Sequence, residues 1–283
     1  MTTTSSSPIE SLGRLRARLR ERVLASKMNP RDADFLLCHA LGRSLTWLIA
    51  HSDDPVDPSA AQGASQMVDR RLAAEPLQYI RGHTEFFGRR FAVDPRVLIP
   101  RPETEILVEA AIKRLAPGAR VLDVGTGSGC IAISIEREML EVNVVGTDRS
   151  IGALAVARLN KERLSSRVAF LAADFVAPLR GAFDLIVSNP PYIPAGVVEG
   201  LAPEVQHHEP RGALTPGPIG TEAFEALLHE GGNLLQSGGL LMLEIGFDQA
   251  AAIRSLASEE GWLMDEMIAD LAGIPRVVVL SRP

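Results

Sequence analysis

Hydrophobic and polar positions follow two different periods along the chain, and the change divides it near residue 80. Before that point, apolar residues recur at spacings of three and four, as in amphipathic helices. Four helices are expected there, over Leu12–Ala25, from Asn29-Pro30 to Leu41 with Gly42 as the stop, from Ser44, and from Asp57-Pro58 through Ala74. We therefore predict an all-helical domain over residues 9–80, with a Ser/Thr-rich, disordered tail over residues 1–8.

After residue 80 the period shortens. Residues 81–100 contain short β-like pieces around Gly88-Arg89-Arg90 and Asp94-Pro95, which favours a hairpin linker. Seven apolar strands then alternate with helical stretches: Val121–Val124, Val142–Asp148, Val168–Leu171, Leu185–Ser188, Leu240–Ile245, Trp262–Ile268 and Val277–Leu280. Such alternation predicts an α/β fold over residues 101–283, with a doubly wound, largely parallel sheet covered by helices on both faces.

A glycine-rich loop follows the first of these strands. The run Asp-Val-Gly-Thr-Gly-Ser-Gly places Gly125, Thr126, Gly127, Ser128 and Gly129 between a strand and an apolar helix. Glycines allow close approach of a ligand to the backbone, and the helix start supplies unpaired N–H groups. The third glycine arrives one residue earlier than in the dinucleotide fingerprint G-x-G-x-x-G, which disfavours a nicotinamide cofactor.

The next strand ends in Asp148, 19 residues after Gly129. A carboxylate at this place is suited to accept hydrogen bonds from two ribose hydroxyls. A glycine turn and a helix-capping Asp are each common alone, but the ordered series of strand, glycine loop, helix, strand and Asp is much rarer. The pattern therefore favours a nucleoside-binding site.

A second chemical motif follows the strand predicted over Leu185–Ser188. Asn189, Pro190, Pro191 and Tyr192 follow its apolar residues. Prolines have no N–H, and Pro190 pushes Asn189 toward extended geometry, so this segment offers acceptor oxygens with few competing donors. The Asn189 side-chain carbonyl and the Pro190 carbonyl suit the two hydrogens of a planar NH2 group, with the Tyr192 ring over its flat face. The alternative is a turn that merely ends a strand.

These residues carry a family resemblance. The loop from Asp123 to Gly129 with Asp148 resembles the S-adenosylmethionine site of class I methyltransferases, and Asn-Pro-Pro-Tyr resembles the motif of enzymes that methylate amino or amide nitrogen. Further motifs are Phe86-Phe87-Gly88, the run from Val97 to Glu105 that includes Pro-Arg-Pro-Glu-Thr-Glu, and Glu209-Pro210 followed by Ala213-Leu214. With them, nearly the whole chain resembles the release factor glutamine N5-methyltransferase (PrmC/HemK) family.

The resemblance implies a seven-stranded Rossmann-like methyltransferase sheet with an antiparallel last strand, joined by the hairpin to helices that dock the substrate. It implies that Gly125 to Gly129 contact the methionine and ribose portions of S-adenosylmethionine, Asp148 the ribose, and Asp174 with Phe175 the adenine region. Asn189 is expected to border the cofactor as well. Asn189, Pro190, Pro191 and Tyr192 would bind the substrate, and Asn189, Pro190 and Tyr192 would serve catalysis. Phe175 is equally well explained as a core aromatic after a strand.

The implied reaction transfers the sulfonium methyl group in line to the side-chain amide nitrogen of a protein glutamine. The Gly-Gly-Gln loop of peptide chain release factors is the implied substrate. An amide nitrogen is a poor nucleophile, and no protein base of ordinary pKa would deprotonate it. Catalysis is therefore expected from positioning and from acceptors that favour an electron-rich nitrogen in the transition state.

The composition of the chain limits the classes of binding partner that we expect. The net charge of −6 and pI of about 5.6 disfavour a nucleic-acid binder, although Arg14, Arg16, Arg18, Arg20 and Arg22 form a local cluster. Their interleaving with leucines is typical of the wet face of an amphipathic helix. Two cysteines, no signal-peptide order and no long apolar run predict a cytoplasmic protein without a disulfide framework or membrane span. His207 and His208 lack a third ligand at regular spacing, so no metal site is expected.

Three functions stay open at the level of sequence. Glutamine methylation in a release factor is the leading one, and a sister family that modifies a glutamine of a ribosomal protein shares most motifs. Methylation of a nucleic-acid base uses the same tetrapeptide, but no basic surface for base flipping is evident. A cofactor-binding module without catalysis is disfavoured, since donor and acceptor motifs are both present.

Two further segments have open roles. Glu103 and Glu105 either orient the following helix or contact substrate, and the Pro/Gly-rich loop 201–219 is a candidate lid.

Overall fold

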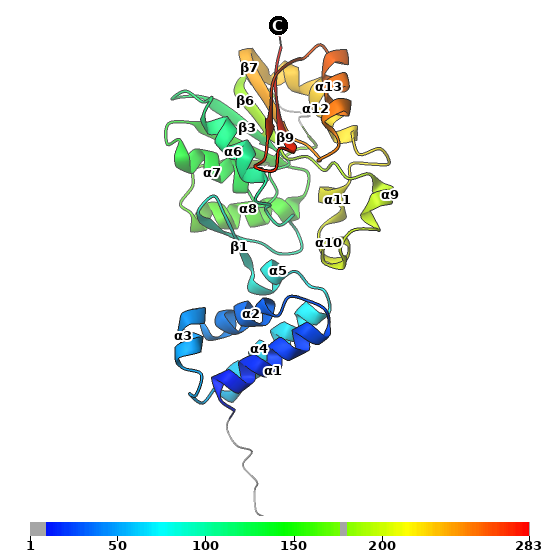
Figure 1. The fold of residues 1–283 in the computed structure, drawn as a ribbon. Coiled ribbons are helices and arrows are strands. Elements are labelled where there is room, and N and C mark those ends of the chain that lie inside the picture. The colour runs from blue at the N-terminus through cyan, green and yellow to red at the C-terminus, as the bar shows by residue number, and fades with distance from the viewer. Residues whose placement is uncertain (1–9, 176–179, 283) are drawn as a thin grey trace, which may run out of the picture. The chain divides into compact units, whose positions relative to one another are not determined.

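The computed structural model describes residues 10–175 and 180–282 of the 283-residue chain, so the predicted tail over residues 1–8 lies outside the described part. The chain forms two compact units that divide between Gly82 and His83. The first contains helices α1 (Leu12–Ala25), α2 (Arg31–Leu41), α3 (Leu45–Ala50), α4 (Pro58–Leu72) and α5 (Leu77–Arg81) (Figure 1). Side-chain caps begin three of them, from Ser11, Ser44 and Asp57.

The apolar stripes of these helices meet in a core of their own. Leu15, Leu19 and Leu36 are fully buried there. The arginine cluster of α1 faces outward and is largely paired with acids: Arg16 and Arg20 with Asp34, Arg18 with Glu10, and Arg22 with Asp69. This local balance of charge explains why five arginines on one short helix do not give a surplus of positive charge at this place.

The second unit begins with an antiparallel hairpin of β1 (His83–Phe86) and β2 (Arg89–Ala92). Its two turn residues, Phe87 and Gly88, have φ of 49° and 69°, the positive values of a type I′ turn, which matches the twist of paired strands. The seven-stranded sheet follows in the order β5-β4-β3-β6-β7-β9-β8. Its strands are β3 (Arg120–Val124), β4 (Asn143–Asp148), β5 (Ala169–Ala172), β6 (Phe183–Ser188), β7 (Leu235–Glu244), β8 (Leu263–Ala269) and β9 (Pro275–Ser281).

The sheet is parallel from β5 to β7, and β9 pairs antiparallel with both β7 and β8. Helices α6 (Thr104–Ile112), α7 (Cys130–Glu138) and α8 (Ile151–Arg163) pack on one face, and α12 (Glu222–Gly231) and α13 (Ala250–Glu259) pack on the other (Figure 1). Short helices α9 (Ala195–Val198), α10 (Pro203–His208) and α11 (Arg211–Leu214) interrupt the long β6–α12 connection, and a 3₁₀ turn (Gly232–Leu234) follows α12. Strands buried on both faces explain the continuous apolar runs in the sequence.

The elements agree with the expected pattern and differ at their ends. Strand β7 begins five residues before the predicted Leu240, because Leu235 pairs with Phe183 of β6 on the far side of an irregular, glycine-containing stretch. Helix α5 has too few residues for a periodic pattern, and no sequence signal announced it. Among the described helices, none has both the length and the apolar character needed to cross a membrane. The described residues likewise hold no group of three metal-ligating side chains.

Candidate functional site

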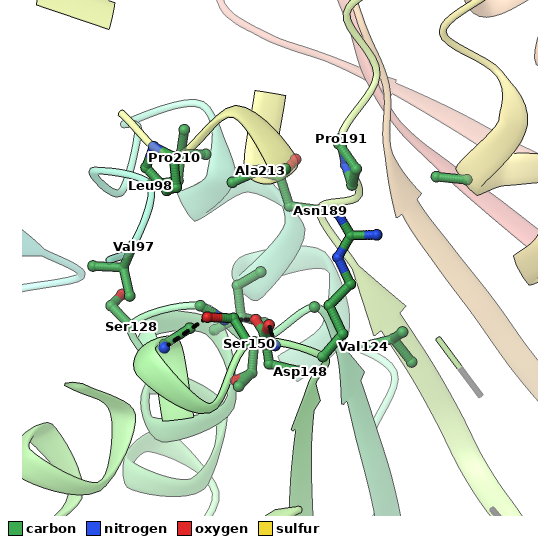
Figure 2. A pocket seen from close by; sticks show the side chains of 18 of the residues that line it. Val97, Leu98, Val124, Ser128, Asp148, Ser150, Asn189, Pro191, Pro210 and Ala213 are labelled. Atoms are coloured by element: carbon green, nitrogen blue, oxygen red, sulfur yellow. Dashed lines mark hydrogen bonds between the residues drawn. The ribbon is translucent and has the colours of Figure 1, made fainter. Parts of the chain in front are cut away.

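Three predicted motifs meet at one edge of the sheet. The glycine loop follows β3, Asp148 ends β4 and Asn189 follows β6, and these neighbouring strands run parallel. Strand order reverses between β3 and β6, which is the place where open α/β sheets bind ligands. A cavity of about 380 Å³ lies there (Figure 2). Its lining includes Gly125, Thr126, Gly127, Ser128, Asp148, Asp174, Phe175, Asn189 and Pro191.

The backbone conformation of the glycine loop requires glycine at three positions. Gly125, Gly127 and Gly129 have φ of 72°, 56° and 81°, values that residues with a side chain rarely adopt. A Cβ on Gly129 would lie 3.0 Å from the Phe170 ring, so this glycine also permits close packing of α7. At Gly127 the space a Cβ would enter is nearly open, because this residue borders the cavity.

Asp123 anchors this loop from within the core. Its side chain is fully buried, and its Oδ2 accepts hydrogen bonds from the Thr126 hydroxyl at 2.6 Å and the Ala132 N–H at 3.2 Å. Burial raises the pKa of Asp123 to about 7, against the lowering effect of these two hydrogen bonds. The residue therefore joins the loop to the first turn of α7 and does not line the cavity.

Asp148 lies across the loop from Asp123, at the cavity wall. One carboxylate oxygen accepts the Gly127 N–H at 3.0 Å and the other accepts the Ser150 N–H at 2.8 Å (Figure 2). Each oxygen has a second lone pair, so the carboxylate keeps acceptor capacity toward the cavity. Asp148 thus fixes the backbone of the glycine loop and still has unused lone pairs at the cavity wall.

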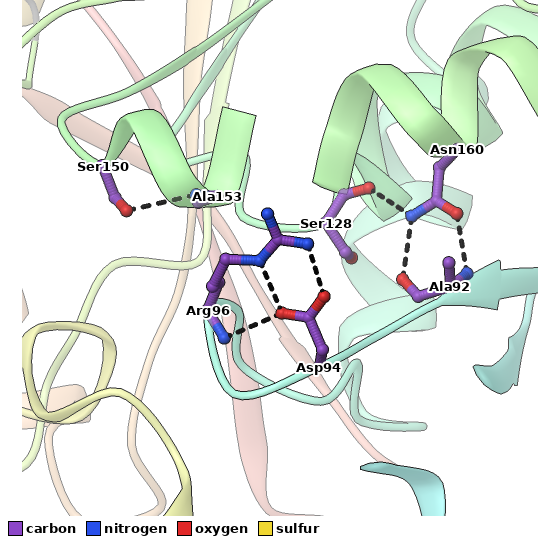
Figure 3. A network of polar contacts seen from close by, with 7 residues as sticks. All are labelled: Ala92, Asp94, Arg96, Ser128, Ser150, Ala153 and Asn160. Atoms are coloured by element: carbon purple, nitrogen blue, oxygen red, sulfur yellow. Dashed lines mark hydrogen bonds and ion pairs between the residues drawn. The ribbon is translucent and has the colours of Figure 1, made fainter. Parts of the chain in front are cut away.

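Asn160 on α8 connects the glycine loop to the hairpin, and sequence reasoning missed it. Its side chain is fully buried and exchanges two hydrogen bonds with the backbone of Ala92, at 2.6 and 3.0 Å, while its NH2 also donates to the Ser128 carbonyl at 2.9 Å (Figure 3). One amide therefore satisfies three buried backbone groups from two distant segments. A lone Asn inside a helix carries no sequence signal of this role.

Asn189 is half-buried at the cavity. Its Nδ2 donates to the Thr104 hydroxyl at 3.1 Å, and Asn189 and Pro191 line the cavity from the same segment (Figure 2). Thr104 belongs to the Pro-Arg-Pro-Glu-Thr-Glu run and is the first residue of α6. The carboxamide is thus held by its NH2 end.

The other members of the tetrapeptide lie farther from the cavity. Pro190 is buried and Tyr192 is half-buried, and neither side chain belongs to the cavity lining. The Tyr192 ring packs on the apolar cluster around α12, and burial raises its phenol pKa to about 12. Its backbone carbonyl accepts a hydrogen bond from Gln249 Nε2 at 2.9 Å. The tetrapeptide is therefore firmly fixed on its inner side.

Asp174 and Phe175 border the cavity beyond β5. Asp174 is exposed, and Phe175 has a φ of 49°, an unusual value for a bulky residue. The half-buried ring of Phe175 also packs against the apolar cluster below the sheet edge. Phe175 therefore belongs both to the margin of the apolar core and to the cavity wall.

One ion pair and two hydrogen bonds connect the remaining motifs to other segments of the chain. Arg101 pairs with Glu209 at 2.5 Å, and the buried Glu209 carboxylate also accepts the Ile99 N–H at 3.4 Å. Glu105 accepts the Phe87 N–H at 2.7 Å, which ties α6 to the hairpin turn. Glu105 thus has an orienting contact, and the segment before α6 is joined to the α10–α11 loop.

Glu244 is a further residue at this edge that sequence reasoning missed. It ends β7, where Leu243 lies opposite Ser188, so Glu244 lies beside Asn189, the first residue after β6. Glu244 is 2% exposed. Burial raises its pKa to about 7, while hydrogen bonding from the Thr104 and Asn189 side chains lowers it. A single acidic residue at a strand end gave no signal in the sequence.

Comparison with known proteins bears on the identity of this site. Residues 10–82 match the family model of the PrmC N-terminal domain, and residues 102–205 match that of the methyltransferase small domain. The release factor glutamine methyltransferase of Bordetella pertussis is 45% identical, over 90% of this chain and 96% of that protein. That of Burkholderia pseudomallei is 42% identical, over 98% of this chain and 97% of that protein. The chain belongs to the release factor glutamine methyltransferase family.

Solved structures agree on the fold. A methyltransferase from Pyrococcus furiosus superposes with a TM-score of 0.53 at 21% identity, covering 77% of this chain and 96% of that one. A ribosomal protein L11 methylase from Lactobacillus delbrueckii subsp. bulgaricus gives 0.50 at 24% identity, covering 67% and 83%. Family and fold together confirm the sequence-based predictions of a release factor glutamine methyltransferase, its Rossmann-like sheet and its S-adenosylmethionine cofactor.

Proposed function

We propose that this protein transfers a methyl group from S-adenosylmethionine to the side-chain amide nitrogen of a glutamine in a peptide chain release factor. One observation carries the proposal: Asn189, held by its NH2 end, borders the same cavity as the glycine loop and Asp148. A donor site and an acceptor site for one methyl group are therefore adjacent.

The residues of the cavity fit S-adenosylmethionine. Gly125, Gly127 and Gly129 have positive φ and add no side chain to the loop, and Asp148 keeps lone pairs suited to ribose hydroxyls. Asp174 and Phe175 border the part of the cavity beyond β5, where the adenine ring would lie. When bound, the sulfonium supplies an electrophilic methyl group.

The acceptor side supplies orientation. The free end of the Asn189 carboxamide is its carbonyl, and the Pro190 carbonyl is the second acceptor assigned to the incoming NH2. Two acceptors draw electron density toward the glutamine nitrogen and hold its lone pair toward the methyl group, which lowers the barrier without a base. We assign the proton to solvent after transfer, when the nitrogen is positively charged. The Tyr192 ring packs against the apolar cluster around α12 and so helps to hold Asn189 and Pro190 in place.

The partner in this proposal is a protein. The net charge of −6 and the paired arginines of α1 offer little to a phosphate backbone. We propose that the helical unit, residues 10–82, docks the release factor, since this part of the chain matches a domain model specific to the family. Activity on release factors would place the protein in the cytoplasm.

Incubation with methyl-labelled S-adenosylmethionine and separate pools of release factors, ribosomes and DNA tests the proposal. We expect label in the release factors, located on one glutamine by peptide mass spectrometry. Label confined to a ribosomal protein would move the activity to the sister family, and label on DNA alone would contradict glutamine methylation altogether.

A further inference from the structure

The buried carboxylate of Glu244 lies beside the segment Asn189–Tyr192 and has no part in the proposed reaction. Glu244 ends β7 next to Asn189, and its neighbours include both Asn189 and Thr104. Its Oε2 is buried with no hydrogen-bond partner among the described residues. A carboxylate in such a place costs stability, because an apolar residue of similar size would avoid both the buried charge and the unpaired oxygen. Structural stability therefore does not explain Glu244.

The chemistry of its two neighbours gives an explanation. A carboxamide can turn end for end, and the Thr104 hydroxyl can either accept a hydrogen bond or donate one. Thr104 alone therefore holds Asn189 in either orientation. An ionised carboxylate only accepts, so an ionised Glu244 favours orientations that turn the Thr104 hydroxyl hydrogen and the Asn189 NH2 toward it. With its hydrogen directed to Glu244, Thr104 meets Asn189 as an acceptor, in agreement with the observed Nδ2 to Oγ1 contact of 3.1 Å.

We propose that Glu244, directly and through Thr104, is a positioning residue that locks the Asn189 carboxamide with its NH2 inward and its carbonyl oxygen toward the acceptor nitrogen. The inference deepens the proposed function and rests on Asn189 as the residue that receives the glutamine amide. A protonated Glu244 loses this control, because a carboxylic acid can donate to the Asn189 carbonyl and so permit the reversed orientation.

Steady-state kinetics of variants at Glu244 and Thr104 test this positioning role. We expect Glu244→Gln and Thr104→Val to lower kcat about tenfold each, a loss of orientation worth about 1.4 kcal/mol, with S-adenosylmethionine affinity unchanged. Thr104→Ser keeps the hydroxyl and should keep kcat within about twofold. Glu136→Gln is the matched control, since Glu136 is also 2% exposed with an unpaired Oε2 but lies on α7. It should leave kcat unchanged.

A double-mutant cycle separates positioning from any independent effect. In an Asn189→Ala background there is no carboxamide to orient, so Glu244→Gln should change kcat by less than about twofold. The same tenfold loss in both backgrounds, or a Glu244→Gln enzyme with wild-type kcat, would overturn the proposal. Glu244→Gln should also be at least as stable as the wild type at pH 8, whereas a structural role demands the opposite.

A spectroscopic test needs no substrate. The Asn189 NH2 signals in ¹H–¹⁵N spectra of the full chain, assigned by their absence in Asn189→Ala, should shift with a midpoint near the Glu244 pKa of about 7. The shift should vanish in Glu244→Gln and persist in Glu103→Gln. Other groups that face Glu244 are Glu103, Arg276, Tyr192 and Cys130. Signals insensitive to pH refute the lock, while an inactive wild type on every glutamine substrate refutes only the proposed function.

Discussion

At the scale of single residues, the site depends on a few backbone positions and one carboxamide. In the proposed reaction Asn189 offers its carbonyl to the substrate, while its NH2 donates a hydrogen bond to Thr104. Gly127 has a φ of 56° and borders the cavity, so its lack of a side chain matters both for the backbone and for the ligand. Each of these features makes a separate prediction, one for turnover and one for cofactor binding.

Asn189→Ala should lower kcat at least about tenfold, because the glutamine NH2 loses one of its two acceptors in the transition state. S-adenosylmethionine affinity should change little. Single-turnover methyl transfer and calorimetric titration of the cofactor measure the two quantities separately. Parallel losses in both would mean that Asn189 mainly shapes the cofactor pocket.

Gly127→Val should abolish cofactor binding, since a branched side chain at positive φ strains the loop and projects into the cavity. Gly273→Val is the matched control: its φ is 80°, nothing lies within 4 Å of an added Cβ, and it belongs to the turn between β8 and β9. The control should lose similar stability yet bind the cofactor normally by calorimetry. Normal binding by Gly127→Val would refute the loop assignment.

At the scale of elements, contacts between distant segments fix the site more than any single helix or strand does. Asn160 joins α8, the end of β2 and the glycine loop, and the Arg101–Glu209 pair joins the segment before α6 to the α10–α11 loop. These contacts span 68 and 108 residues along the chain. The motifs recognised in the sequence are therefore held together by tertiary hydrogen bonds.

Asn160→Leu keeps the side-chain volume but leaves the Ala92 backbone and the Ser128 carbonyl without partners. We expect a loss of about 3 kcal/mol in the free energy of unfolding, the usual cost of orphaning buried polar groups, together with weaker cofactor binding. Urea denaturation measures the first effect. Asn143→Leu, at an exposed position of β4, should stay within about 0.5 kcal/mol of wild type. Equal effects of the two substitutions would contradict a role for Asn160 in joining the segments.

At the scale of the whole molecule, two buried carboxyl groups link folding to pH. Asp123 and Glu244 both have pKa values raised by burial to about 7, above the 3.8 and 4.5 of the unfolded chain. The folded state therefore binds more protons than the unfolded state between these limits. Stability from this source is complete below about pH 4 and is lost as pH rises through about 7.

This linkage predicts the behaviour of Glu244→Gln in urea denaturation at pH 5 and pH 8. Wild type should lose stability between these values, and the variant should lose about 3 kcal/mol less, because its amide carries no charge to bury. Measurement of both proteins at both pH values cancels the contribution of other titrating groups. An identical loss in the variant would show that Glu244 keeps an ordinary pKa.

The sequence by itself determined the order and type of nearly all elements, because apolar periodicity reports burial, and glycine and proline report backbone geometry. It also placed Gly125 to Gly129, Asp148 and Asn189 at strand ends, and it identified the family, since these motifs are contiguous in the chain. Strand boundaries such as the start of β7 depend on pairing with a neighbour and were not readable.

Only the tertiary structure decided which side chains meet around Asn189. Glu244 lies beside Asn189 because β6 and β7 are neighbours in register, and Thr104 reaches both because α6 packs at the same edge. The raised pKa of Glu244 is likewise a property of its burial. Hydrogen bonds and desolvation depend on distance in space, and residues 104, 189 and 244 become neighbours only when the sheet has formed.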